Sequence, residues 1–110
     1  MITINYDINQ PIWQVFSYCI DKWYVTLEEC KISSITVKND MSLGIRIYRK
    51  STKSSQMISE SLINTIEAQD NHFYFTNKDR AEEIYEKLVE QATRRNIEIE
   101  KRKEAIDFFF

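Results

Sequence analysis

Apolar and polar residues alternate with a period of two over much of the chain before residue 76, a pattern typical of strands with one buried face. Strands are predicted at residues 23–27, 30–38, 45–50, 57–66 and 73–75, from this alternation or from runs of strand-favouring residues. Residues 2–8 have the same alternation and are expected to form either a strand or an extended lead-in. Turns are expected at residues 9–11, 39–40 and 67–72, and a polar loop at residues 51–56.

Residues 12–20 fit two different elements. Ile12, Phe16 and Cys19 follow helical spacing, with Pro11 well placed for the first helical position. The same stretch is rich in strand-favouring residues, and Asp21–Lys22 after it could form a two-residue hairpin turn. Both a helix and a strand remain open on the residues alone.

A helix is predicted after the last strand. Thr76 is expected to be its N-cap, and Asp79 places an acid near the positive end of the helix dipole. A stripe of apolar residues follows at helical spacing, formed by Ala81, Ile84, Tyr85, Leu88 and Ala92. An amphipathic helix over residues 76–105 is therefore expected to pack on the sheet.

Beyond Ala92 the apolar stripe becomes sparse, and the chain ends in three consecutive phenylalanines. Clustered aromatic residues after a charged stretch are typical of interface anchors. The predicted partner-binding residues are Ile99, Ile106, Phe108, Phe109 and Phe110. This tail could pack on its own sheet, on a second copy of the chain in a homodimer, or in a groove of another protein.

With 110 residues, of which 43% are apolar, the chain has the size of one domain. Its expected parts are a β-rich region at 1–75, a helix at 76–105 and a hydrophobic tail at 106–110. No apolar run approaches the roughly 18 residues that a membrane span needs, and no leader pattern precedes the first strand. We therefore expect a soluble, cytoplasmic protein with no membrane partner.

The chain has one glycine, Gly44, so its turns are expected to depend on Asn and Asp, which tolerate the left-handed conformation. Two cysteines and one histidine are too few for a structural zinc site, and no metal is expected. A disulfide between Cys19 and Cys30 is conceivable. Free, buried thiols are the expectation for a reducing compartment.

Charge is distributed unevenly. Residues 31–56 hold six bases (Lys31, Lys38, Arg46, Arg49, Lys50 and Lys53) against Asp40, a net charge of +5, whereas the whole chain has −2. Arg46, Tyr48 and Lys50 should share one face of a strand, an arrangement that suits phosphate contact and base stacking. With Arg49 and Lys53 they form the candidate nucleic-acid site. The alternative is a solvated sheet face with a lysine-protected edge.

No catalytic constellation is recognisable. Glu28, Glu29, Glu60 and His72 would have to converge for acid–base chemistry, and a single glycine excludes a glycine-rich phosphate loop. We expect no enzyme activity and no cofactor.

Four stretches resemble a group of small β-rich proteins of phages and prophages. They are Tyr6 to Trp13, Trp23–Val25 with Cys30–Val37, Ile45–Tyr48, and Phe75–Thr76 leading into Ala81–Glu82. The resemblance implies an SH3-like barrel with a C-terminal helix, and it favours a strand at 12–20. Asn9 stands where the group has glycine, the spacing from Thr76 to Ala81 is one residue longer than usual, and the chain from about residue 93 has no counterpart.

The sequence thus predicts an α+β fold, with a small antiparallel β-sheet or SH3-like barrel of about five strands followed by a C-terminal amphipathic helix. The predicted function is that of a non-enzymatic binding protein acting through protein–protein contacts. The resemblance adds, as an analogy, an accessory role or inhibition of a host or anti-phage defence complex. The alternative is a nucleic-acid-binding module that uses residues 46–53.

Overall fold

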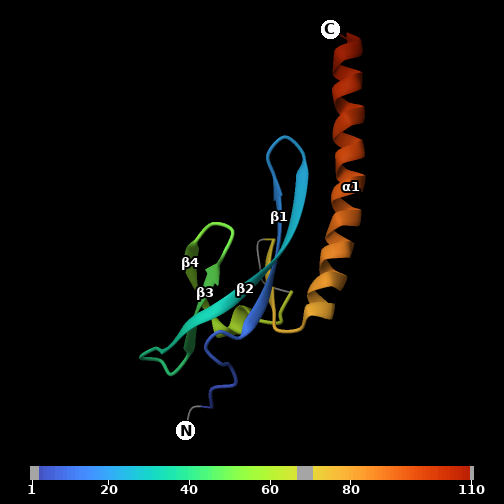
Figure 1. The fold of residues 1–110 in the computed structure, drawn as a ribbon. Helices are drawn as coiled ribbons and strands as arrows, with labels where there is room; N and C mark the ends of the chain where they lie inside the picture. The colour runs from blue at the N-terminus through green and yellow to red at the C-terminus, as the bar shows by residue number, and fades with distance from the viewer. Residues whose placement is uncertain (1–2, 67–70, 110) are drawn as a thin grey trace.

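The computed structural model describes residues 3–66 and 71–109, with side chains as far as Glu104. The elements are β1 (Pro11–Cys19), β2 (Trp23–Val37), β3 (Leu43–Arg49), β4 (Ser54–Ser59), the 3-10 helix η1 (Glu60–Leu62), β5 (His72–Phe75) and α1 (Lys78–Phe109). The strands form one antiparallel sheet in the order β4-β3-β2-β1-β5, and α1 stands beside it (Figure 1). The predicted α+β fold is confirmed, with the sheet open rather than closed into a barrel.

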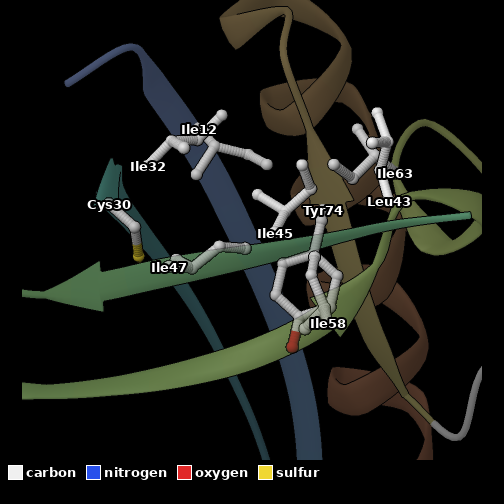
Figure 2. Packing of buried hydrophobic residues seen from close by; sticks show 9 residues of the cluster. All are labelled: Ile12, Cys30, Ile32, Leu43, Ile45, Ile47, Ile58, Ile63 and Tyr74. Carbon is white, nitrogen blue, oxygen red and sulfur yellow. The ribbon is translucent and has the colours of Figure 1, made fainter. Parts of the chain in front are cut away.

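The sheet curls around an inner core. Its buried members point toward one another from all five strands and from the segment after η1 (Figure 2): Ile12, Cys30, Ile32, Leu43, Ile45, Ile47, Ile58, Ile63 and Tyr74. Ile63 forms a parallel bridge with Tyr74, and the Asn64 N–H donates to the Tyr74 carbonyl at 2.7 Å. The chain after β4 therefore reaches β5 at the opposite edge of the sheet. The two edge strands, β4 and β5, both contribute to the inner core although they do not pair with each other.

Residues 12–19 lie in β1, and the helical interpretation of 12–20 is wrong. Ile12 faces the inner core, whereas Trp13 and Val15 face the side of the sheet on which α1 packs. Because both faces of β1 are covered, its apolar residues run almost continuously and the period-two signal is weak. The connection to β2 is the three residues 20–22, one more than the predicted two-residue turn, because Cys19 pairs with Trp23.

Two predicted strand boundaries are wrong for a common reason. Residues 23–37 form a single strand that continues through Glu28 and Glu29, because β2 first pairs with β1 and then passes to β3. The predicted loop at 51–56 contains the start of β4, whose first residues are exposed. At residues 28–29 and 54–56 the backbone forms the hydrogen bonds of the sheet. The side chains there are polar, so the sequence pattern does not reveal the strand.

Of the two alternatives predicted for residues 2–8, the strand is wrong, and the described residues of this segment lead into β1 without joining the sheet. Residues 3–7 have no regular secondary structure, and Ile4 and Ile8 are about half exposed. Tyr6 alone in this segment packs against the inner core. The chain then turns at Asn9, which has a φ of 69°, with the Gln10 N–H donating to the Asp7 carbonyl at 3.2 Å. The expectation of left-handed asparagines at turns is thus confirmed here.

The segment between β4 and α1 differs from the prediction in two places. The strand expected over 57–66 ends at Ser59 and is followed by η1. His72 belongs to β5 rather than to a turn, and Asn71 before it takes the left-handed conformation. Residues 67–70 of the predicted turn lie outside the described residues.

The N-cap of α1 is Asn77, one residue later than predicted. Its Oδ1 accepts the Arg80 N–H at 3.1 Å, and its carbonyl accepts the Ala81 N–H at 3.1 Å. Thr76 instead exchanges hydrogen bonds with the Asn64 side chain. Asp79 lies in the first helical turn, as expected.

The first half of α1 covers the outer face of the sheet. Ala81 and Ile84 are buried with Val15, Phe73 and Phe75 in a second cluster, the outer core. Half-buried side chains surround this cluster: Trp13, Val25, Leu27, Tyr85 and Leu88. Fully burying a large apolar side chain such as Val15, Phe75 or Ile84 stabilises the fold by about 1.5–3 kcal/mol, and together these exceed what a cap supplies. The predicted apolar stripe of the helix therefore packs as expected.

Candidate interaction surfaces

The tip of the β1–β2 hairpin is joined to the middle of α1. The Asn96 Oδ1 accepts the Trp23 N–H at 2.7 Å, and the Asn96 Nδ2 donates to the Trp23 carbonyl at 3.0 Å. The Arg95 guanidinium lies 4.5 Å from the centre of the Trp23 ring. Lys22 approaches the helix along the next turns, where it lines a hollow together with Ile97 and Glu100. These contacts end the packed part of α1.

The projecting half of α1, which we define as Ile97 to Phe109, continues past the hairpin tip and away from the sheet (Figure 1). Ile97 is 51% exposed, Ile99 is half-buried, and residues 100–104 are exposed. Of the predicted partner-binding residues, Ile106, Phe108 and Phe109 belong to the helix, but their side chains lie outside the described residues. Phe110 lies outside them altogether. The sequence prediction missed Ile97, which lies among charged residues.

The basic residues of the candidate nucleic-acid site divide between two faces. Arg46 and Tyr48 point outward, opposite to the buried Ile45 and Ile47, as alternation along β3 requires. Arg49 faces the other way, and its Nη2 donates to the Gln56 Oε1 at 2.9 Å. Arg49 is therefore separated from the predicted set.

Lys50 and Lys53 follow β3 at different places. Lys50 lines a surface hollow of about 420 Å³ with Tyr48, Lys31, Glu29 and Cys30. Lys53 is exposed in the turn before β4, with a left-handed φ of 50°. The sequence prediction missed Lys31, which lies directly opposite Tyr48 on β2. Only the register between β2 and β3 brings these two residues together.

The four candidate acid–base residues lie on separate elements or faces. Glu28 accepts hydrogen bonds from the backbone and hydroxyl of Ser51, and Glu29 is the next residue on the same strand, so it points to the opposite face. Glu60 lies in η1, and His72 stacks on Phe16 with 3.8 Å between ring centres. Within the described ranges, no three His, Cys, Asp or Glu side chains are placed to hold a metal ion.

The two cysteines are free thiols in different environments. Cys30 belongs to the inner core, where burial, with a smaller effect of Glu28, raises its pKa to about 11. Cys19 is exposed at the end of β1, so the expectation that both thiols are buried is wrong for this residue.

Aromatic rings form a column on the hairpin face opposite α1. Phe16 stacks on His72 and on Tyr18, with 5.0 Å to the latter ring, and Tyr18 stacks on Tyr24 at 5.3 Å. Tyr18 and Tyr24 are cross-strand partners, so the column stabilises the two-stranded part of the hairpin. The rings cover one another's faces, and we interpret the column as structural.

No helix in the described parts of the chain is both long enough and apolar enough to cross a membrane. Comparison with protein families, with curated proteins and with solved structures found no match. The resemblance to small phage proteins therefore stays a prediction, and function has to be argued from the surfaces themselves.

Proposed function

We propose that this protein is a non-enzymatic protein-binding module whose projecting half of α1 inserts into an apolar groove of a protein partner. The observation that carries the proposal is that this helical segment continues past the hairpin tip and beyond the sheet, with Ile97 51% exposed although Lys22 of the tip lines a hollow with it. An amphipathic helix laid into a groove is a recurring mode of protein recognition.

The dimensions of the molecule support this proposal. Its radius of gyration is 17.7 Å and its extents are 65 × 27 × 26 Å. A compact chain of this length has a radius of gyration of about 13 Å. The difference arises because a 32-residue helix is about 48 Å long, well beyond the reach of the hairpin.

The composition of the projecting half also favours a partner. A segment of this length is marginally helical in water by itself. Ile97 is half exposed, and the later part of this segment is apolar in sequence at Ala105, Ile106, Phe108 and Phe109. Exposed apolar residues on a helix are stabilised when another protein covers them. The accessory or inhibitory role that the phage resemblance implies is a narrower form of the same proposal.

Affinity capture from the native host tests this proposal. The bait variants are a deletion of residues 107–110 and Ile97→Lys. The matched control is Ile20→Lys, because Ile20 is 80% exposed at the hairpin tip and undergoes the same change. We expect the wild type and the control to capture one protein that neither helix variant captures. The same protein, once purified, should bind the wild type directly. A partner retained equally by all variants contradicts the role of the helix.

A further inference from the structure

The outer face of the sheet is covered by α1 over only part of its width. The helix packs on β5, on β1 and on the first half of β2, through Val25 and Leu27. The second half of β2, with β3 and β4, has no helix above it (Figure 1). This uncovered area is separate from the projecting half of α1.

Strand register places basic residues together on the uncovered area. Lys31 lies opposite Tyr48, and Tyr48 lies opposite Ser55, to whose hydroxyl the Arg46 Nη1 donates at 3.4 Å. A Cβ on Gly44 would lie 3.2 Å from the Lys38 Cε, so the lysine side chain extends over this outer position. We call Lys31, Lys38, Arg46, Tyr48 and Lys50 the basic face.

The charges of the basic face are available to a ligand. Ion pairs among the described residues lie along α1, and none involves a lysine or arginine of the basic face. Acids do lie near this face: Glu29 lines the hollow with Lys31 and Lys50, and Asp40 and Glu60 line a second hollow with Lys38. Asp40 accepts a hydrogen bond from the Ser42 hydroxyl at 2.6 Å and is also attracted by Lys38, so the least compensated bases are Lys31, Arg46 and Lys50. The potential over this area is therefore positive although the whole chain is acidic.

Tyr48 gives the basic face an aromatic surface. Its side chain is 38% exposed and borders the hollow of about 420 Å³ between Lys31 and Lys50. That volume is within the range of small-ligand sites, about 300–1,000 Å³. A planar ring stacked on Tyr48 would place its attached phosphates within reach of the two lysines.

We propose that the basic face binds single-stranded nucleic acid, with a base stacked on Tyr48 and the adjoining phosphates held by Lys31, Lys50 and Arg46. An aromatic platform beside a cationic track is how single strands are bound without strong sequence preference. A protein-interface core, in contrast, is depleted of charged residues. A duplex fits poorly because its bases are already stacked on each other.

Fluorescence anisotropy with labelled single strands of about twelve thymidines or uridines tests the proposal. This length suits the site size of single-strand-binding domains such as OB-folds, which cover roughly 4–16 nucleotides each. We expect binding at about 50 mM salt that weakens steeply by 200 mM, with a slope of log K against log salt near −2 for three phosphate contacts. Tyr48→Leu should weaken binding roughly 5- to 100-fold, whereas Tyr48→Phe, which keeps the ring, should stay within about twofold.

A matched pair of charge reversals distinguishes binding at the basic face from general electrostatic attraction of the strand to the protein. Lys31→Glu should weaken binding about tenfold or more, whereas Lys103→Glu on α1 makes the same change in net charge and should alter binding less than about threefold. Equal losses for the two variants, or no binding at about 50 mM salt, overturn the proposal. Thermal melts of each variant verify that the sheet is folded.

Competitors distinguish the class of ligand. Unlabelled single strand should displace the probe, whereas a mononucleotide, a duplex and a polyglutamate peptide should compete at least about tenfold less well. A mononucleotide that competes as well as the strand would indicate a nucleotide site instead. A peptide that competes equally, together with an unaffected Tyr48→Leu variant, would indicate an acidic protein partner. Either result overturns the single-strand proposal, and neither concerns the projecting half of α1.

Discussion

The buried Cys30 thiol makes the stability of the fold depend on pH. Burial favours its neutral thiol, so its pKa is about 11 in the folded chain and near its ordinary value of 9.0 when unfolded. The folded state therefore binds more protons in this range. The stabilisation is complete below about pH 9 and is lost as the pH rises through 11.

Urea unfolding at pH 8, 9 and 10 measures this effect. We expect the free energy of unfolding to fall with rising pH, and to fall less steeply in Cys30→Ala. Tyr74, whose pKa burial also raises, is retained in the variant and serves as the internal control. Parallel slopes for the two proteins would contradict the assignment to Cys30.

Gln14 gives a second prediction at this scale. Its side chain is 4% exposed, and its Nε2 is buried with no acceptor in good hydrogen-bond geometry among the described residues, the Tyr74 side chain opposite it on β5 making at most a weak contact. A buried donor without an acceptor costs about 1–3 kcal/mol. Gln14→Met keeps the volume and removes the donor, so the urea midpoint should stay the same or rise. Gln14→Glu should lower it. A large loss for the methionine variant would show that the amide is needed.

The sequence predicts which face of a strand a residue occupies, but not which residue of the neighbouring strand lies beside it. The outward direction of Arg46 and Tyr48 followed from alternation within one strand, and it was correct. The neighbour of Tyr48, Lys31, is seventeen positions away and could not be found without knowing how β2 pairs with β3. The N-cap was misplaced because Thr76 and Asn77 are both good caps, and the hydrogen bonds between Thr76 and Asn64 decide between them.

At the scale of elements, α1 has two halves with different energetic roles. Ile84 is buried in the outer core, so Ile84→Ala should lower the free energy of unfolding by about 2–5 kcal/mol. Ile97→Ala makes the same change on the same helix at a half-exposed position and should alter it by less than about 0.5 kcal/mol. Equal losses in chemical denaturation would mean that the fold buries Ile97.

The hairpin depends on α1 through one side chain. Asn96→Ala removes both hydrogen bonds to Trp23 and leaves its backbone groups without partners, at a cost of about 1–3 kcal/mol. We expect faster hydrogen exchange over residues 17–27, with unchanged exchange in β3. Asn39→Ala, in the exposed turn after β2, is the control and should leave both regions unchanged. Unaltered exchange in the hairpin would show that this contact does not hold it.

Element types were mostly predictable because the apolar pattern is strong where one face is buried. Failures occurred where that condition does not hold. β1 is covered on both faces, so its period was ambiguous; β4 begins as an exposed edge, so Ser54 to Gln56 resembled a loop. The curl that brings Ile63 against Tyr74 depends on long-range pairing and has no local signal.

For the whole molecule, the sequence predicted the sheet and the helix but not the elongated shape. That shape arises because α1 continues for more than ten residues beyond Asn96, whose side chain bonds to Trp23 in the hairpin. It leaves two surfaces available on opposite parts of the protein, the projecting half of α1 for a protein partner and the basic face for a single strand. The two proposals can fail independently, since they share no residue.

The central claim is that α1 divides near Asn96 into a packed half and a projecting half. Hydrogen–deuterium exchange of the isolated chain, resolved along α1, measures this directly. We expect strong protection from about Ala81 to Asn96, and exchange at least about tenfold faster beyond Glu100, because an unsupported helical end opens readily. Even protection along the whole helix, independent of protein concentration, would contradict the account.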